Sequence, residues 1–418
     1  MKRPRIVHVC AFDRGGAANS ALRLHRDLRA AGFDSQVVVA VKKGNEAHVH
    51  EVPGWLHRWT WPHVTTLDYR LGRLVCPARL RYGTPSLVPG FAARFIEELQ
   101  PDIVHLHWVA ASFLSIAQIG RIPHPVVWTL HDMWALTPGY NYRVDARAAL
   151  GGIDAFRPLL PEGPFRALGE NIWRRKLRAW SRMKSIVVAP SRWLAEEARR
   201  SEIFREREVL TIPYSVPLEV FRPGDRPTLR RSLGLPEDRT LLLSGADGAF
   251  YRKGVDLLDT ALRLARDRLG PSIPPLSVVL FGRDSEGWLR ECGVDLVHFG
   301  VVESEAKMAA LFAACDVFAC PSREDNLPNT ILESLACGTP AVGFRIGGLP
   351  DLIQDGVNGF LAEPFDATQL AANLVQTIEL QRQGLSLGTA ARRLAEERYT
   401  PDQTSLRYVD LYDRLAGA

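Results

Sequence analysis

The sequence has few cysteines, and no two of them are spaced as in a redox or zinc motif. The six are scattered through 418 residues, several in apolar stretches (Cys10, Cys76, Cys292, Cys315, Cys320 and Cys337). This spacing excludes a Cys-x-x-C centre and a small disulfide-stapled domain. It predicts reduced thiols buried in a core.

Long apolar runs are also missing. No stretch approaches the roughly eighteen apolar residues that suffice for a membrane-spanning helix. The first residues, MKRPRIVHVCAF, place a short apolar run, interrupted by His8, after basic residues. This pattern fits a buried first strand better than a signal peptide. We therefore expect a cytoplasmic protein.

Neither sign of charge dominates the composition. The formal net charge is +5, with 46% hydrophobic and 24% charged residues. These values are typical of an ordered globular protein. Any preference for an anionic partner must then be local, and nucleic acid is not expected as a partner. The length favours two domains over one.

Short apolar strands alternate with helical patterns along both halves of the chain. In the first half we expect strands at Arg5–Cys10, Ser35–Val41, Ile103–Trp108 and Val126–Leu130, a strand and turn at Ser185–Ser191, and a short strand near Leu210–Ile212. In the second half we expect them at Thr240–Ser244, Leu276–Phe281, Val297–Phe299, Val317–Cys320, Ala341–Gly343 and Gly359–Ala362. The proline-rich stretch PYSVPLEVFRPGDRP between the halves is the expected hinge. The pattern predicts two Rossmann-like α/β domains facing each other across a cleft.

A cluster of acidic and amide residues follows one of these strands. The strand Val317–Cys320 leads into the polar loop Ser322–Leu327, and the helix behind that loop carries a further carboxylate, Glu333. In an open parallel sheet, ligands bind beyond the carboxyl ends of the strands. We therefore expect this loop to face a ligand; the alternative is a solvated turn and an ordinary helix carboxylate.

Two adjacent glycines follow the first strand. Gly15 and Gly16 stand between that strand and a helix. There the backbone can approach phosphate or sugar oxygens, or the glycines only permit a tight turn.

Histidines gather at the ends of two other strands. His105 and His107 point to one face because they are two residues apart. His131 and Asp132 end the strand Val126–Leu130. Because no third ligand has convincing metal-binding spacing, structural or substrate-contact roles are favoured for these histidines.

Two segments of the first half combine aromatic and basic residues. The stretch from 55 to 82 shows no clear strand or helix period and contains Trp55, Trp59, Trp61, Arg58, Arg70, Arg73, Arg79 and Arg81. The helix expected near 165–182 has a basic flank of Arg174, Arg175, Lys176, Arg178 and Arg182. Both suit a surface that meets anionic lipid. The alternatives are aromatic packing in a loop-rich lobe and an ordinary solvated helix.

Ten motifs occur in the order that they take in one enzyme family. They are FDRGGAANSALRL, PDIVHLHW, VVWTLHDMW, APSRWL, IPYSVPLEVFRP, RKGVDLL, FGRD, ACDVFACPSREDNLPNTILESLACGTPAV, GGLPDLI and DGVNGFLAEP. Over nearly its whole length the chain resembles the retaining glycosyltransferases of the GT-B architecture. This is the large group 1 family that includes sucrose synthase and bacterial mannosyl- and polysaccharide glycosyltransferases.

The resemblance assigns roles to the acidic cluster. The family signature is an acid, seven intervening residues and a glutamate, a spacing that Asp325 and Glu333 match. The first acid is usually glutamate, so either Asp325 or the adjacent Glu324 is left for that role. By resemblance, Glu333 would accept hydrogen bonds from the donor ribose. The first acid would contact donor-sugar hydroxyls, assisted by the backbone amides of Asn326 and Leu327.

Cationic and glycine positions of the family also have counterparts. Lys253 matches the lysine that binds the donor diphosphate. The family arginine shortly before it is missing, and Arg252 is its candidate substitute, although neighbours on a helix start would face different ways. By resemblance, His131 would contact the donor sugar, and Gly15 with Gly16 would lie beneath the diphosphate.

The sequence departs from the family pattern at one position, and it lacks one common metal-binding motif. The Asn-Gly pair that often follows the family's hinge strand is Tyr214-Ser215 here, and no Asp-x-Asp motif occurs. The resemblance implies an enzyme without metal or other cofactor, in which Lys253 and helix dipoles stabilise the leaving group.

The resemblance also implies a division of labour along the chain. Residues 1–214 would bind the acceptor, 215–395 the nucleotide-sugar donor, and a helix in 396–418 would cross back to the first domain. The expected activity is retaining transfer of a hexosyl or related sugar to a glycan or lipid-linked acceptor in cell-surface polysaccharide assembly, at the cytoplasmic face of a membrane. The alternatives are a same-fold epimerase or phosphorylase and a non-enzymatic membrane-binding scaffold.

Overall fold

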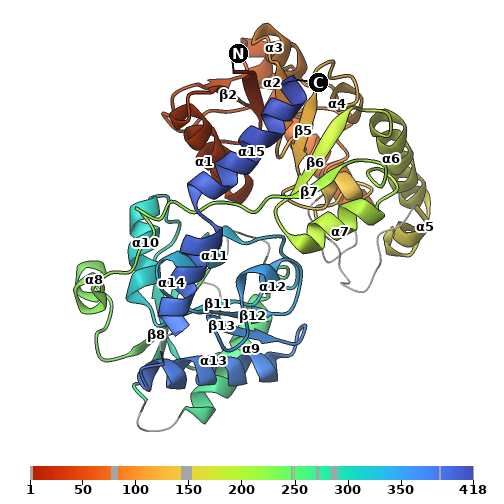
Figure 1. Ribbon diagram of the computed structural model, residues 1–418. Helices are drawn as coiled ribbons and strands as arrows, with labels where there is room; N and C mark the ends of the chain where they lie inside the picture. Colours follow the sequence, from red (N-terminus) through yellow and green to blue (C-terminus); the bar gives the residue numbers. More distant parts are fainter. Residues whose placement is uncertain are drawn as a thin grey trace. The chain divides into compact units, whose positions relative to one another are not determined.

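The chain forms two compact units in the computed structural model. The model describes residues 3–76, 83–142, 153–245, 248, 250–269, 273–283, 289, 291–385 and 387–417. The first unit consists of Met1–Tyr214 with Pro401–Ala418, and the second of Ser215–Thr400. Each unit is an α/β fold around one parallel sheet (Figure 1).

The first unit is built on a seven-stranded parallel sheet with the order β3-β2-β1-β4-β5-β6-β7. The strands are β1 Arg5–Val9, β2 Asp34–Val39, β3 Val49–Glu51, β4 Ile103–Leu106, β5 Val126–Thr129, β6 Ser185–Ala189 and β7 Val209–Thr211. Alternate residues pack into separate cores on the two faces, so that Ile6 and Ile103 lie in one core and Val7 and Val104 in the other.

Helices cover both faces of this sheet. They are α1 Gly16–Ala30, α2 Trp55–Val75, α3 Ala92–Glu98, α4 Ile116–Ile119, η1 Trp134–Leu136, α5 Ile153–Phe156, η2 Arg157–Leu159, α6 Pro164–Trp180, α7 Arg192–Arg200 and α15 Pro401–Ala416. The carboxyl-terminal helix α15 lies beside α1 (Figure 1). Its residues Tyr408, Leu411 and Tyr412 join the core of the Ile6 face. The last helix therefore packs on the first unit.

The second unit is built on a six-stranded parallel sheet with the order β10-β9-β8-β11-β12-β13. Its elements are α8 Arg226–Leu233, β8 Thr240–Gly245, α9 Val255–Arg268, β9 Leu276–Phe281, β10 Asp295–His298, α10 Glu305–Ala314, β11 Val317–Cys320, α11 Asn329–Ala336, β12 Ala341–Phe344, α12 Leu349–Leu352, β13 Gly359–Ala362, α13 Ala367–Arg382 and α14 Leu387–Arg398. The predicted alternation of strands and helices in two parallel-sheet units is confirmed.

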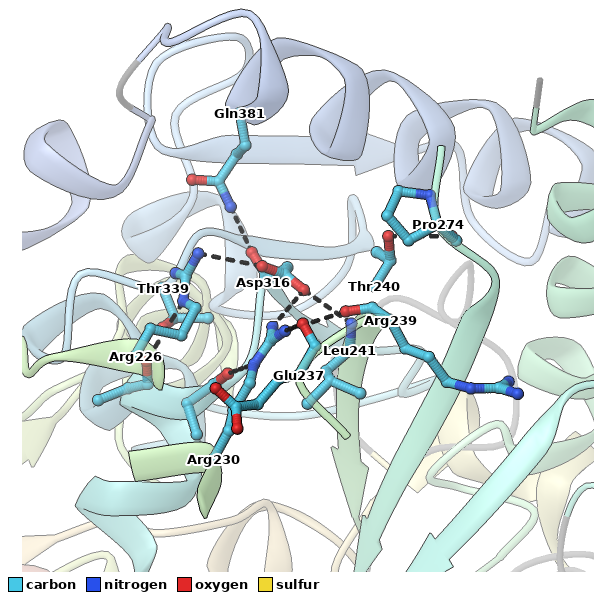
Figure 2. A network of polar contacts seen from close by, with 12 residues as sticks. Arg226, Arg230, Glu237, Arg239, Thr240, Leu241, Pro274, Asp316, Thr339 and Gln381 are labelled. Atoms are coloured by element: carbon cyan, nitrogen blue, oxygen red, sulfur yellow. Dashed lines mark hydrogen bonds and ion pairs between the residues drawn. The ribbon is translucent and has the colours of Figure 1, made fainter. Parts of the chain in front are cut away.

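A polar network fixes the start of β11, the strand that carries the acidic loop. Asp316 accepts hydrogen bonds from Arg230 Nη2 at 2.8 Å, from Arg226 Nη1 at 3.0 Å and from the backbone N–H of Leu241 at 2.7 Å. Figure 2 shows these groups converging on Asp316, with Gln381 reaching its backbone carbonyl. Because Leu241 belongs to β8, the network holds α8, β8 and β11 together at the amino ends of the two strands.

The structure corrects the interpretation of the segment from 55 onward. Residues 55–75 form the helix α2, which contains Pro62. Its buried positions follow helical spacing, but they include polar residues and a glycine, which hid the apolar period (His57, Trp61, Asp68, Gly72 and Val75). Arg79 and Arg81 lie outside the described residues.

The predicted basic flank of α6 also needs a correction. The side chain of Lys176 is fully buried, and its Nζ donates hydrogen bonds to the carbonyls of Trp134 and Thr137. The ammonium lies 4.0 Å from the centre of the Trp134 ring, and burial lowers its pKa well below the ordinary value. Lys176 therefore supports the loop after β5 and is not part of the surface. No described helix is long and apolar enough to cross a membrane.

Candidate active site

The sheet topology marks one position in each unit where ligands are expected. In the second unit the strand order reverses between β8 and β11, and in the first between β1 and β4. Parallel sheets bind ligands beyond the carboxyl ends of such strand pairs, where the connections diverge to opposite sides. The segments that follow these four strands contain Lys253, Asp325, Gly15 and His107. Except for Glu333 and His131, the predicted site residues therefore lie at these two positions.

Two cations and one carboxylate meet beyond β8 and β11. Lys253 Nζ is 2.6 Å from Asp325 Oδ2, and Arg252 Nη1 is 3.2 Å from the same oxygen. Arg252 also donates to the Glu324 carbonyl at 3.0 Å. Arg252 and Lys253 precede the start of α9, in a turn. The expectation that these neighbours would face different ways is wrong, because turn geometry lets both side chains reach Asp325.

Buried carboxylates concentrate around this cation pair. Glu324, Asp325 and Glu333 are only 5%, 7% and 7% exposed. Burial acts to raise the pKa of Asp325, but Lys253 and Arg252 outweigh it, so that the pKa lies below its ordinary value. Asp325 is therefore an anion at neutral pH. Two buried acids after β11, with a third in the following helix α11, are costly for the fold alone, which favours a ligand-binding role.

Two glycines allow the acidic loop to pack this closely. A Cβ on Gly254 would lie 1.9 Å from the Pro321 carbonyl oxygen, and one on Gly347 would lie 1.9 Å from that of Asp325. Both residues have positive φ, +67° and +50°. The loop is thus held between the turn before α9 and the turn after β12.

Replacement of Gly254 by alanine is expected to destabilise the second unit. Gly234 is a matched control, because its φ and ψ of 68° and 29° resemble the 67° and 32° of Gly254, while no atom lies within 4 Å of its Cβ position. Gly234→Ala should cost about 1–2 kcal/mol for the left-handed conformation. Gly254→Ala should cost about 1–3 kcal/mol more, because the Pro321 backbone must move. Urea unfolding of the two variants measures the difference, and equal costs would contradict the packing account.

Two glycines of the first unit stand at the start of the helix α1. Gly15 has a φ of +100°, and no atom lies within 4 Å of its Cβ position. It precedes Gly16, the first residue of α1, and no side chain caps the helix. The first turn of the fifteen-residue helix α1 therefore follows β1 at the position where anions bind at helix amino termini.

A chain of histidines runs from the core of the first unit to its sheet edge. His8 Nδ1 is 3.0 Å from His107 Nε2, and His107 Nδ1 is 3.0 Å from His131 Nε2. His131 Nδ1 is 2.7 Å from the Tyr214 hydroxyl. The predicted orientation of His105 and His107 to one face is confirmed, and His8 pairs with His105 in the adjacent strand. Sequence spacing missed His8, because it is 99 residues from His107.

The same histidines include a group with the spacing of metal ligands. Ring nitrogens of His8, His105 and His107 lie within 4.8 Å of one another. However, His105 is engaged by the Tyr412 and Thr129 hydroxyls at 2.6 and 2.7 Å. His8 Nε2 alone among these six ring nitrogens has no hydrogen-bond partner among the described residues. These histidines therefore form a hydrogen-bond network, which agrees with the structural role that the sequence favoured for them.

His8, at the buried end of this row of histidines, sets the direction of the hydrogen bonds along the row. Each neutral imidazole has one N–H and one lone pair, so all three rings must donate in the same direction. A buried N–H without an acceptor costs more than an unused lone pair. His8 therefore carries its proton on Nδ1, and so do His107 and His131. His131 then donates to Tyr214, and burial lowers the pKa of His131 to about 3.

The proton positions are a testable prediction. In protein labelled with ¹⁵N-histidine, long-range ¹H–¹⁵N spectra at pH 7 should show His8, His107 and His131 protonated on Nδ1. This tautomer is the minor one in free histidine, so the reversed state is easily distinguished. Protons on Nε2 of these residues would contradict the inferred direction. Individual His→Gln substitutions supply the assignments.

Two family models match the chain. The model described as Glycosyl transferases group 1 matches residues 238–379 in the second unit. The model described as Glycosyltransferase Family 4 matches residues 14–220 in the first. Together they include every site residue predicted from the sequence.

Curated relatives carry a related description. A D-inositol 3-phosphate glycosyltransferase of Geodermatophilus obscurus is 28% identical over an alignment of 416 residues. The alignment covers 93% of this chain and 84% of that protein. The protein of that name from Mycobacterium marinum is 29% identical over 307 residues, 70% of this chain and 60% of that protein.

Solved structures share the fold at low identity. Sucrose-phosphate synthase from Thermosynechococcus elongatus superposes with a TM-score of 0.71 at 16% identity, covering 99% of both chains. Anabaena HepE in complex with UDP-glucose has a TM-score of 0.66 at 17% identity, covering 99% of this chain and 100% of that one. WaaG, a glycosyltransferase involved in lipopolysaccharide biosynthesis, has a TM-score of 0.64 at 17% identity, covering 97% of this chain and 99% of that one. The chain belongs to the group 1 glycosyltransferases and has the GT-B fold.

Proposed function

We propose that the protein transfers a sugar from a nucleotide diphosphate-sugar to an acceptor hydroxyl with retention of anomeric configuration. The observation that carries the proposal is the convergence of Lys253 and Arg252 on the buried Asp325, beyond the switch-point strands of the second unit. Two cations fixed at one point suit a diphosphate, and an adjacent buried carboxylate suits sugar hydroxyls. The UDP and UDP-glucose complexes of Anabaena HepE support a nucleotide-sugar donor.

The chemistry is electrostatic. Negative charge develops on the diphosphate as the glycosidic bond breaks, and preorganised cations stabilise that charge without reorganisation of solvent. Lys253 and Arg252 supply two such charges, so we assign no step to a metal or other cofactor. Glu333 would bind the ribose, Asp325 or Glu324 the sugar hydroxyls, and the amides of Asn326 and Leu327 would assist.

The first unit is assigned to the acceptor and to part of the donor. The amino terminus of α1, at Gly15 and Gly16, would contact the diphosphate. His131 would contact the donor sugar as a neutral group. Both of its ring nitrogens already have partners in His107 and Tyr214, so this contact requires the ring edge, the backbone or an exchange of hydrogen bonds.

Incubation with UDP-, GDP-, ADP- and dTDP-sugars tests the proposal. The acceptor panel includes an inositol phosphate, suggested by the names of the curated relatives, and a lipid-linked glycan. Proton NMR of the product should show the anomeric configuration of the donor. An inverted product would contradict retention, and loss of transfer after chelation of metals would contradict metal independence. Product formed from donor alone would instead indicate an epimerase or a phosphorylase.

We also assign the enzyme to the cytoplasmic face of a membrane, where lipid-linked glycans for cell-surface polysaccharides are assembled. The supporting feature is the outer face of α2, where Trp55 and Trp59 are 74% and 65% exposed and Leu67 is 50% exposed. Exposed tryptophans with nearby arginines suit the boundary of an anionic bilayer.

Co-sedimentation with phosphatidylglycerol vesicles tests this assignment. Trp55→Ser/Trp59→Ser should release the protein from the vesicles, whereas substitution of the exposed Leu406 should not. A parent protein that does not bind vesicles would contradict the assignment. Salt-dependent vesicle binding without sugar-nucleotide binding would favour a non-enzymatic scaffold.

A further inference from the structure

A pocket lined by arginines lies between α4 and α6 of the first unit. Its volume is about 600 Å³. Its lining residues are Ser86, Leu87, Ile116, Ala117, Gly120, Arg121, Arg175, Arg178, Ala179 and Arg182. None of them is acidic, so the pocket combines four positive charges with small and apolar side chains.

Most of these guanidinium groups have no partner among the described residues. Arg175 Nε donates to Asn171 Oδ1 at 2.8 Å, but the guanidinium groups of Arg121, Arg178 and Arg182 make no hydrogen bond or ion pair with any residue that the structure describes. By contrast, Arg174 on the same helix pairs with Glu170 at 3.0 Å. Like charges without counter-charges repel one another, and an anion would relieve this repulsion.

The ends of the two helices do not account for four guanidinium groups. A helix carboxyl terminus favours a nearby cation. However, the Leu177 and Trp180 carbonyls of the last turn of α6 already accept from the backbone N–H groups of Ser181 and Met183, and the Ser181 carbonyl accepts from Arg207. The arginines of the pocket are not needed as caps.

The walls of the pocket are fixed by close packing. Trp180 Nε1 donates to the Ile116 carbonyl at 3.0 Å. A Cβ on Gly120 would lie 2.5 Å from the Ala179 carbonyl oxygen, so α4 approaches α6 as closely as only glycine allows. The arginines therefore project from a preformed frame.

The pocket lies at the edge of the sheet opposite the candidate active site. Arg121 precedes β5, Arg182 precedes β6, and Arg178 is in the last turn of α6 before β6. In a parallel sheet the amino ends of the strands share one edge. His131 follows the carboxyl end of β5 and so belongs to the other edge.

We infer that this pocket is a second anion site, which binds a phosphate group of a ligand that also has an apolar or sugar part. Guanidinium groups match the geometry of phosphate oxygens and remain charged at all physiological pH values. The volume is in the range of small-molecule sites, and Leu87 and Ile116 provide apolar surface for the rest of the ligand. The site is independent of the proposed sugar transfer.

Titration with sodium pyrophosphate and with glycerol 3-phosphate tests the site. All arginine substitutions are made in the Lys253→Ala variant, the background protein, because the candidate donor site of the parent also attracts phosphates. Arg178→Gln/Arg182→Gln should weaken binding by about tenfold or more, since two charge-assisted contacts are lost. Arg94→Gln/Arg174→Gln removes the same charge from arginines that pair with Glu98 and Glu170, and it should leave binding unchanged. Circular dichroism verifies that both variants fold.

The same proteins are then mixed with phosphatidylcholine vesicles with and without phosphatidylglycerol. Binding to anionic vesicles that depends on Arg178 and Arg182 identifies a lipid headgroup as the source of the phosphate. Binding of soluble phosphates alone identifies a free metabolite. Equal affinities of the pocket variant and the background protein for all these probes would overturn the inference, as would equal losses in the two arginine variants.

Discussion

Replacement of Lys253 by alanine is expected to lower kcat for sugar transfer by about 100- to 1000-fold. Lys253 Nζ is fixed 2.6 Å from Asp325 Oδ2, so the ammonium is held in place before the donor binds. Removal of one preorganised charge-stabilising group from an active site typically costs this factor. Arg252 remains close to Asp325 and should preserve part of the donor affinity. The loss should therefore be larger in kcat than in KM.

Lys307→Ala is the matched control for this variant. Lys307 belongs to the same unit but is exposed on α10, and its ammonium lies 5.3 Å from the centre of the Phe299 ring. Its replacement should leave kcat unchanged, and Lys253→Arg should restore part of the lost activity. Turnover of Lys253→Ala within a factor of ten of the parent, measured with saturating donor, would show that the cation pair is not part of the catalytic site.

Acidification from pH 7 to pH 5 is expected to destabilise the first unit by several kcal/mol. Burial strongly lowers the pKa of five of its histidines, to about 4 in His25, to about 3 in His131 and well below the ordinary value in His8, His105 and His107, and it also lowers the pKa of His50. The unfolded chain takes up these protons below its pKa of about 6.5, whereas the folded unit does not. The free energy of unfolding therefore falls as the pH falls, by about 2 kcal/mol per histidine over this range.

Two carboxyl groups act in the opposite direction. Burial raises the pKa of Asp68 to about 6 and also raises that of Asp132. These groups bind protons more readily in the folded state, so each adds stability as the pH falls. Five histidines outweigh two carboxyl groups, and the net change remains comparable with the stability of a typical domain.

The second unit is the internal control for this prediction. Ten of the eleven histidines lie in the first unit, and the other is His298. The lowered pKa of Asp325 costs stability only as the pH falls through the ordinary aspartate pKa of about 3.9, where the unfolded chain takes up the proton, so it contributes little between pH 7 and pH 5. Urea unfolding at pH 7 and pH 5, followed by tryptophan fluorescence and amide exchange, should show an acid shift in the first unit. A shift confined to the second unit, or no shift, would contradict the account.

Much of the second unit could be predicted from the sequence because the residues that define its strands, loop and helix are close together in the sequence. Strand β11, the acidic loop and α11 are consecutive, and the glycines, prolines and apolar runs around them set their limits. The spacing from Asp325 to Glu333 is a property of one loop and one helix. Only the expected orientation of Arg252 relative to Lys253 was wrong, because both residues lie in a turn before α9 and not at the helix start.

The first unit was less predictable because its key contacts are distant in sequence. Strand β3 has three residues, too few for a pattern. The buried face of α2 contains His57, Asp68 and Gly72, so its helical period was not apolar. Lys176 is surrounded in sequence by arginines and so resembles a surface residue. Its ammonium nevertheless binds carbonyls that follow β5, about 40 residues earlier in the sequence. Such partners are known only once the helix is packed on the sheet.

The central claim is that the second unit holds a nucleotide-sugar donor through Lys253, Asp325 and Glu333. Thermal unfolding in the presence of UDP-, GDP-, ADP- and dTDP-glucose tests it most directly, because a ligand that binds the folded state stabilises it. We predict that at least one of the four raises the unfolding temperature of the parent protein and of Lys307→Ala, but not that of Glu333→Ala. The claim is contradicted if none of the four stabilises the parent, or if folded Glu333→Ala responds as strongly as the parent.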